Sequence, residues 1–180
     1  MSTTAQTATV ATSGSGTPSL RRRLACLLYE SILLFAVVAI AGLVFALVFQ
    51  QRHALQWRGT VMAFLFVVLG LYFIWCWRRG GQTLAMQTWY IRLETSTGAP
   101  LSNARAFARY VCGYVWVLPP LALVAVNGLN EVGVGGATAI LLAWVVGYGL
   151  ASRAHPQRQF WHDALCGTRQ VSFRPVRPKD

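Results

Sequence analysis

The sequence contains few charged residues, and acidic residues are the scarcest of them. Only 12% of its 180 residues are charged, and only five are Asp or Glu. A soluble domain carries about 25% charged residues, so this chain lacks the polar surface that such a domain needs. The sequence also contains no HExxH motif, no glycine-rich phosphate loop and no pair of catalytic carboxylates. We therefore expect a protein that is neither soluble nor an enzyme.

Cysteine is sparse and isolated. The four cysteines form no CxxC pair, and no spacing between cysteine and histidine matches a zinc site. Cys76 and Cys112 fall in apolar segments, where they fit as small core residues. Ser31, Cys26 and Cys112 have no histidine in the same segments that could activate them as nucleophiles. The sequence thus predicts no disulfide framework, no metal site, no cofactor and no catalytic residue.

Long apolar runs are abundant instead. Hydrophobic residues make up 55% of the sequence. Each of four segments approaches the roughly 20 residues that a helix needs to cross a bilayer. Pro119-Pro120 removes backbone donors inside the third segment, so we expect a kink or break there. One such segment alone would fit a buried core helix, but four in series predict four transmembrane helices, at residues 24–48, 60–77, 107–126 and 134–151.

The basic residues are distributed unequally around these four segments. If the N-terminus lies on side one, the other side holds only Arg52 and Arg58. By the positive-inside rule, side one is the cytoplasm and contains both termini. This clustering explains the net charge of +11, so we expect the lipid bilayer and no nucleic acid as a partner. Side one holds Arg21, Arg22, Arg23, Arg78, Arg79, Arg92, Arg105, Arg109, Arg153, Arg158, Arg169, Arg174, Arg177 and Lys179.

The chain divides into a membrane domain and two tails. Residues 1–19 carry no charge and are mostly Ser, Thr, Gly and Ala, which is typical of a disordered tail. A signal peptide is not expected there, because the cationic run follows this segment rather than preceding it. We assign residues 20–173 to one membrane domain and residues 174–180 to a basic tail.

The linker between the second and third spans is long enough to form a small cap on the cytoplasmic side. Gly80-Gly81 should end the second span, and Ser102 should cap the helix that leads into the third. Residues 84–93 show no clean period, so helix and strand both remain open. Residues 168–173 alternate like a short strand, which would pair with residues 91–94.

Polar residues inside the apolar segments are rare, and Arg23 with Glu30 is the most informative pair. Their spacing of seven residues is about two helical turns, so both lie on one face of the first helix. A carboxylate inside a membrane helix is costly and suggests a functional site. Glu30 has two interpretations. It is satisfied structurally, by Arg21–Arg23 or by water at the headgroups, or it pairs across the bundle and exchanges protons with an ion. We favour the structural interpretation.

Three segments resemble the RDD family of bacterial membrane proteins, which is named for one arginine and two aspartates. In RRRLACLLYE, Arg23 matches the arginine and Glu30 takes the place of the first aspartate. In RQFWHDALCGTRQV, Asp163 matches the second aspartate, within a His-Asp motif that ends in Gly-Thr. Between them, WRRGGQTLAMQTWYIRLETSTGAPLS is similar to the family's Gly-Gln-Thr loop. The resemblance runs from about Arg21 to Val171.

The resemblance implies that Arg23, Glu30 and Asp163 converge at the cytoplasmic end of the bundle. Because that side has few acids and many arginines, Asp163 should also pair with an arginine there, such as Arg23 or Arg109. Further supporting residues are His162, Gln82, Thr83 and Thr168.

The sequence departs from the family pattern at three positions. Glu30 is longer than aspartate by one methylene, Ala85 stands where glycine is usual, and Gln87 stands where a basic residue is usual. The last two departures remove a close backbone approach and a phosphate or lipid contact that the family pattern would imply. Some family members have been linked to cation–proton exchange.

The fourth span carries a stripe of small residues at four-residue spacing, which we call the ridge. Small residues in register let another helix approach closely, so the ridge should be a helix-packing face. For the chain as a whole, a second copy and another membrane protein remain open as partners besides the bilayer. The ridge consists of Gly135, Ala139, Ala143, Gly147 and Ala151.

Together these patterns predict an all-α membrane protein of the bacterial cytoplasmic membrane. The fold is a four-helix bundle with cytoplasmic termini and a small cytoplasmic cap. Two functions remain open. One is a non-catalytic membrane scaffold or assembly factor with a structural cluster of arginine and acid. The other is a transport-related protein, in which Glu30 carries a proton or cation. We favour the scaffold, because no internal repeat is visible and the span centres are almost purely apolar.

Overall fold

The computed structural model describes residues 16–49 and 58–173. Most of the predicted N-terminal tail, Arg52 in the loop between the first two spans, and the C-terminal tail at 174–180 lie outside the described residues.

Four helical stretches are long and apolar enough to cross a membrane, as the sequence predicts. They are Leu20–Val48, Arg58–Gly80, Asn103–Asn127 and Leu129–Ala154. Large apolar side chains such as Phe35 and Leu47 remain exposed on their outer surfaces, at 76% and 69%. In water such surfaces would be unfavourable, whereas acyl chains solvate them. The first two stretches correspond to helices α1 (Leu20–Phe49) and α2 (Arg58–Gly80).

The third stretch is broken in the middle, which confirms the interruption expected from Pro119-Pro120. Helix α4 (Asn103–Gly113) passes into the single turn η1 (Tyr114–Trp116), and α5 (Leu118–Asn127) then continues the span. The prolines occupy the first turn of α5. Proline is tolerated there because the first amides of a helix have no intrahelical acceptor. The break therefore falls just before the prolines.

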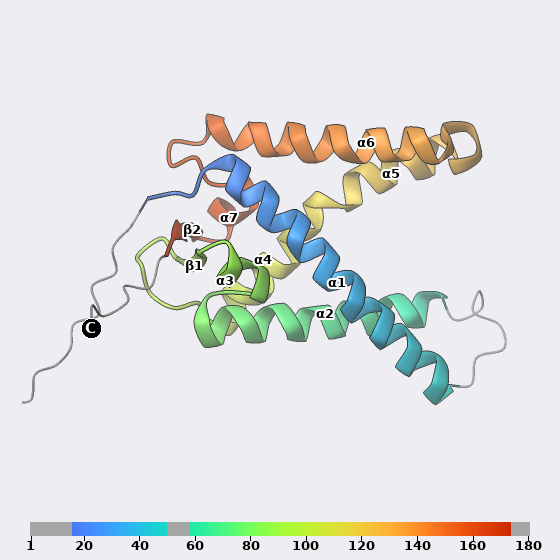
Figure 1. Ribbon diagram of the computed structural model, residues 1–180, viewed down its shortest axis with the longest axis horizontal. Coiled ribbons are helices and arrows are strands. Elements are labelled where there is room, and N and C mark those ends of the chain that lie inside the picture. The colour runs from blue at the N-terminus through green and yellow to red at the C-terminus, as the bar shows by residue number, and fades with distance from the viewer. Residues whose placement is uncertain (1–15, 50–57, 174–180) are drawn as a thin grey trace, which may run out of the picture.

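Helices α5 and α6 (Leu129–Ala151) form an antiparallel pair; the end where they join lies away from α1 and α2, while the C-terminal end of α6 lies beside the start of α1 (Figure 1). Helix α6 changes direction at Gly133, whose φ of 67° is left-handed, and ends in the turn η2 (Ser152–Ala154). Trp144 of α6 donates from Nε1 to the Val115 carbonyl oxygen at 2.8 Å. This bond ties the fourth span to the broken part of the third.

The ridge is exposed rather than packed against the described part of the chain, contrary to the prediction for a single chain. All five of its residues are exposed, and a Cβ atom added at Gly135 or Gly147 would meet nothing within 4 Å. The side of α6 that faces the bundle carries Trp144, Tyr148 and the buried Gly149 instead. The ridge lies on a different face of the helix, so it packs against no other described helix. A contact between chains stays a prediction.

A small cap closes one end of the bundle, which we call the capped end. It consists of α3 (Leu84–Thr88), β1 (Ile91–Thr95), α7 (Trp161–Leu165) and β2 (Thr168–Ser172). The strands pair antiparallel with Leu93 opposite Gln170, which confirms the predicted pairing. The open question about residues 84–93 is resolved as one helical turn followed by a strand. Ser102 caps α4 as predicted, because its Oγ accepts from the Arg105 amide.

Gly81 explains why α2 ends where the sequence predicts. Its φ is +68°, and a Cβ atom there would lie 2.6 Å from the Leu93 carbonyl oxygen. The amide of Leu93 donates to the Gly81 carbonyl at 2.7 Å. Only glycine permits both this backbone conformation and this approach. The end of α2 is thereby fixed against β1.

Both ends of the described chain meet at the capped end (Figure 1). The Ser172 amide donates to the Gly16 carbonyl at 3.0 Å. Arg22, in the first turn of α1, donates from Nε to the Trp89 carbonyl at 2.7 Å and from Nη1 to Ser172 Oγ at 3.2 Å. The start of α1 is therefore fastened directly to the cap.

Candidate functional site: a buried polar cluster at the capped end

Asp163 is the most completely buried acid of the described residues, with no exposed surface. Its Oδ1 accepts from Arg109 Nε at 2.7 Å, and its Oδ2 accepts from Gln170 Nε2 at 2.8 Å. The guanidinium of Arg109 also stacks over the ring of Trp77, 4.3 Å from its centre. One carboxylate thus joins α7, α4 and β2, and the arginine extends the connection to α2.

The backbone around Asp163 is held by neighbouring polar side chains. Thr168 donates from Oγ1 to the Asp163 carbonyl at 3.0 Å. Gln159 donates to the Gln170 carbonyl and accepts from the Gln170 amide, both at 3.0 Å. These bonds fix the turn between α7 and β2, and they hold Gln170 where it reaches the carboxylate.

Burial by itself raises the pKa of Asp163. The charge of Arg109, the neighbouring His162 and the hydrogen bond from Gln170 outweigh that effect and hold its pKa below the usual value of 3.8. Asp163 is therefore an ionised, fully paired carboxylate at neutral pH.

His162 is buried beside this pair. Its Nδ1 lies 2.9 Å from the Tyr148 hydroxyl, and its Nε2 lies 3.4 Å from Asp163 Oδ1. Burial lowers the pKa of His162 below 6.5; the negative charge of Asp163 opposes this effect and the positive charge of Arg109 adds to it. The imidazole is consequently neutral at neutral pH and bridges α6 to α7.

Glu30 lies on α1 and is bound by hydroxyl groups rather than by an arginine. Its Oε1 accepts from the Tyr72 hydroxyl at 3.0 Å, and its Oε2 accepts from Thr83 Oγ1. Thr83 also caps α3, because its Oγ1 accepts from the Met86 amide at 3.2 Å. The neighbouring Gln82 donates to the Ile91 carbonyl at 2.6 Å. The Gly-Gln-Thr loop thus joins α2, β1 and α1 through three successive residues.

Arg23 shares the buried end of α1 but forms no hydrogen bond with Glu30, contrary to the expectation that the two would pair. Its Nη2 donates to Ser152 Oγ at 3.3 Å, and its guanidinium lies over the Phe160 ring, 4.2 Å from the centre. Only 4% of Arg23 is exposed. Among the described residues, its Nε and Nη1 have no hydrogen-bond partner.

A cavity of about 580 Å³, which we call the central cavity, connects these groups. Its polar end includes Arg23, Glu30, Thr83, Arg109, His162 and Gln170. The remaining wall is mostly apolar and extends along α1 to Val38. Leu69 of α2, Gly113 of α4 and Val117, which directly precedes α5, also contribute to it. Asp163 lies behind Arg109 and does not line the cavity.

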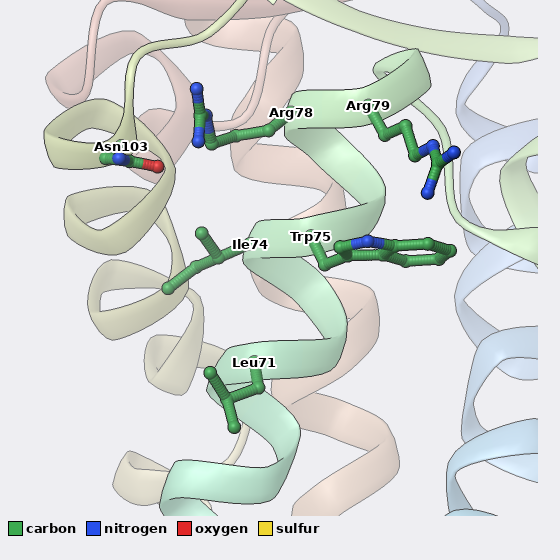
Figure 2. A pocket seen from close by; sticks show the side chains of 6 residues that line it. All are labelled: Leu71, Ile74, Trp75, Arg78, Arg79 and Asn103. Carbon is green, nitrogen blue, oxygen red and sulfur yellow. The ribbon is translucent and has the colours of Figure 1, made fainter.

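A second, outer pocket of about 410 Å³ lies on the exposed side of α2 and α4. Figure 2 shows Arg78 extending toward Asn103, while Arg79 lies over Trp75. Arginine and tryptophan side chains are typical of membrane–water boundaries. The residues of this pocket are therefore typical of a surface at the membrane–water boundary rather than of a ligand-binding site.

The structure brings Arg23, Glu30 and Asp163 into one region, as predicted, but Arg23 does not pair with either acid. Asp163 pairs with Arg109, one of the arginines that the sequence suggested for it. Ala85 is completely buried where α3 packs on α1, so its methyl group occupies a position where the family pattern has only the hydrogen of glycine. Gln87 is exposed. In the part of the chain that the structure describes, no three His, Cys, Asp or Glu side chains gather as a metal site.

Sequence reasoning missed four partners: Tyr72, Tyr148, Ser152 and Gln170. Tyr72 carried a usable signal, because it is a hydroxyl in the apolar interior of the second span. Gln170 carried none, since a glutamine in a short alternating strand is an ordinary surface residue until its strand is paired.

The chain matches the RDD family over residues 17–167, which is most of its length. No curated protein and no solved structure is significantly similar to it.

Proposed function

Because the chain belongs to the RDD family, we propose that it is a non-catalytic scaffold or assembly factor of the bacterial cytoplasmic membrane. In this role the four spans present a rigid cap on the cytoplasmic side. The single observation that carries the proposal is the buried bond between Arg109 and Asp163 at 2.7 Å.

The arrangement of that bond favours a structural role. Both carboxylate oxygens of Asp163 are engaged, and the residues that bind it come from α4 and β2. A buried ion pair with satisfied hydrogen bonds fixes a unique arrangement of the elements that contribute to it. Chemistry would instead require an accessible group, and Asp163 has no exposed surface.

The charge distribution supports the cytoplasmic placement of the cap. The arginines around it, including Arg22, Arg92 and Arg169, exceed by far the basic residues near the opposite end. Basic residues near short loops are retained in the cytoplasm during insertion.

Cation–proton exchange is the second candidate, and Glu30 is the observation that favours it. The carboxylate is buried and lines the central cavity, and among the described residues it accepts only from the hydroxyl groups of Tyr72 and Thr83. Such a group can change its protonation state without leaving a cation stranded.

Proton flux in proteoliposomes distinguishes the two functions. The full-length protein and its Glu30→Gln variant are reconstituted, and internal pH is followed after a sodium or potassium gradient is applied. A scaffold gives no ion-dependent flux in either protein. Flux that is present in the parent and lost in a folded Glu30→Gln variant would replace the scaffold proposal with exchange. Asp163→Asn serves as the structural comparison, because it should reduce the yield of folded protein.

A further inference from the structure

The central cavity has the polarity profile of a lipid rather than of a soluble metabolite. Its charged residues gather at the capped end, and its walls become apolar along α1 from Leu27 through Leu34 to Val38. At about 1.5 Å per helical residue, Arg23 and Val38 are separated by about 22 Å along the axis. The hydrocarbon of one bilayer leaflet is about 15 Å deep, half of the 30 Å core. The apolar wall is therefore long enough to line an acyl chain across one leaflet.

Arg23 supplies hydrogen-bond donors at the polar end. Its Nε and Nη1 have no acceptor among the described residues, although only 4% of the residue is exposed. A buried donor without an acceptor is costly, and for a charged group the cost is larger. Ser152 and Phe160 fix the guanidinium, so its position does not depend on an added partner.

The other charged residues that line the cavity are already engaged. Arg109 is bound to Asp163, and Glu30 accepts from Tyr72 and Thr83. His162 contacts the Tyr148 hydroxyl and is neutral at neutral pH, because burial lowers its pKa. Of the two arginines that line the cavity, Arg109 is bonded to a carboxylate, whereas Arg23 is bonded to none among the described residues.

From these observations we propose that the central cavity binds an anionic lipid. The phosphate of the headgroup accepts hydrogen bonds from Arg23, and one acyl chain lies along the apolar wall beside Leu34, Val38 and Gly113. Arginine is well suited to phosphate because its bonds are charge-assisted. The volume of about 580 Å³ lies within the usual range of ligand sites. This inference is independent of whether the protein acts as a scaffold or an exchanger.

Two substitutions probe the two halves of the site separately. Arg23→Gln removes the charge that receives the headgroup. Gly113→Leu fills the apolar part, and it should fold because a Cβ atom at Gly113 meets nothing within 4 Å and its φ of −62° is helical. The matched controls are Arg78→Gln in the outer pocket and Gly42→Leu, whose Cβ atom also meets nothing within 4 Å.

The test is titration of the delipidated full-length protein in detergent, with bound lipid counted by native mass spectrometry. The probes are phosphatidylglycerol, phosphatidylcholine and glycerol phosphate, which has the headgroup without the tails. We expect one phosphatidylglycerol to bind more tightly than phosphatidylcholine. Arg23→Gln should weaken that binding about tenfold, the value of one hydrogen bond to a charged group. Gly113→Leu should weaken both lipids, and neither control should change the tightest site.

Three results would overturn the proposal. Unchanged phosphatidylglycerol affinity in folded Gly113→Leu would mean that lipid binds only to the outer surface. If the parent binds both lipids with equal affinity and Arg23→Gln does the same, Arg23 does not recognise the headgroup. Binding of glycerol phosphate as tight as that of phosphatidylglycerol would leave an anion site without a lipid. If Arg23→Gln does not fold, Gly113→Leu and the glycerol phosphate titration still decide the outcome.

Discussion

At the scale of single residues, the ionisable groups of the capped end differ in how well they are satisfied. Among the described residues, Asp163 has a partner for each oxygen, Glu30 is bound only by hydroxyl groups, and Arg23 retains two nitrogens without an acceptor. Removing one member of a buried pair strands the other, whereas the same change at an exposed pair is mostly compensated by water. The three groups should therefore respond differently to substitution.

Removing one partner of the buried pair Arg109 and Asp163 should cost more stability than removing one partner of a more exposed ion pair. Asp163→Asn leaves the arginine buried without a charge partner, which costs about 3–5 kcal/mol in the free energy of unfolding. Adding Arg109→Met should cost less than the sum of the two single changes, since no charge is left alone. Reversible unfolding in mixed micelles measures all three variants.

The pair of Arg169 and Glu94 provides the contrast. Arg169 Nη2 lies 2.7 Å from Glu94 Oε1, but the two side chains are 32% and 21% exposed. Arg169→Gln should cost no more than about 1 kcal/mol. Equal costs at the two pairs would contradict the structural role assigned to Asp163.

Stability should fall on acidification, and His162 should cause the first part of the loss. The pKa of His162 is lowered by burial, so below about pH 6.5 the unfolded chain takes up a proton that the folded chain does not. The loss amounts to about 1.4 kcal/mol per pH unit until the folded pKa is reached. Asp163, whose pKa lies below 3.8, adds a second loss at lower pH, where its carboxylate becomes protonated.

Thermal unfolding between pH 8 and pH 5 tests the histidine part. The midpoint should stay level above pH 7 and fall below 6.5. His162→Gln, which keeps a hydrogen-bonding side chain but does not titrate, should flatten this decline. An undiminished decline in that variant would assign the effect to another group.

At the scale of the elements, the exposed and buried faces of the helices are decided by their large residues. Helix α2 presents Gly70 to the ring of Tyr110, and α6 presents Trp144 and Tyr148 to the bundle. The ridge of small residues points outward, although its spacing is the one that favours close helix packing. Aromatic side chains bury more surface than Gly or Ala can, so they determine which side of α6 faces inward.

Leucine should therefore be tolerated at Gly147 and not at Gly70. A Cβ atom at Gly147 meets nothing within 4 Å, so Gly147→Leu should change the stability of one chain by at most about 0.5 kcal/mol. At Gly70 the added Cβ atom lies 3.1 Å from Tyr110 Cε1, and overpacking of this kind costs about 1–3 kcal/mol. Thermal unfolding in detergent compares the two.

The oligomeric mass of the same two variants tests the remaining role of the ridge. A second copy seated on the ridge would be displaced by leucine at Gly147, which light scattering would register as a loss of mass. If mass and stability are both unchanged, the ridge faces only lipid.

At the scale of the whole molecule, the cap makes one end of the bundle different from the other. Two of the four span-length stretches lie between β1 and β2 in the sequence, yet the two strands pair at the capped end. The first turn of α1 is bonded to the same cap through Arg22. The described chain thus begins and ends at the capped end.

A reporter fused after Asp180 should consequently be cytoplasmic, and one inserted near Gln56 should be external. Fourteen basic residues on the predicted cytoplasmic side against two on the other provide the reason. Phosphatase and fluorescent-protein fusions give opposite signals on the two sides. External activity of the fusion after Asp180 would refute the proposed orientation.

The sequence by itself determined the features that depend on composition and local pattern. Long apolar runs have only one stable environment for their backbone, so the four spans could be read directly. The proline pair located the break in the third span, and Gly81 and Ser102 located helix ends, because these residues act through their own backbone or that of their neighbours.

Only the tertiary structure decided which polar groups meet. Arg23 and Glu30 share a helix face, yet α1 lies between two different parts of the molecule, so Arg23 reaches Ser152 while Glu30 reaches Tyr72 and Thr83. The choice of Arg109 for Asp163 likewise depends on how α4 and α7 are placed. A helix face fixes the direction of a side chain but not the neighbour it meets, because that neighbour comes from a distant segment whose position is set by the packing of the whole bundle.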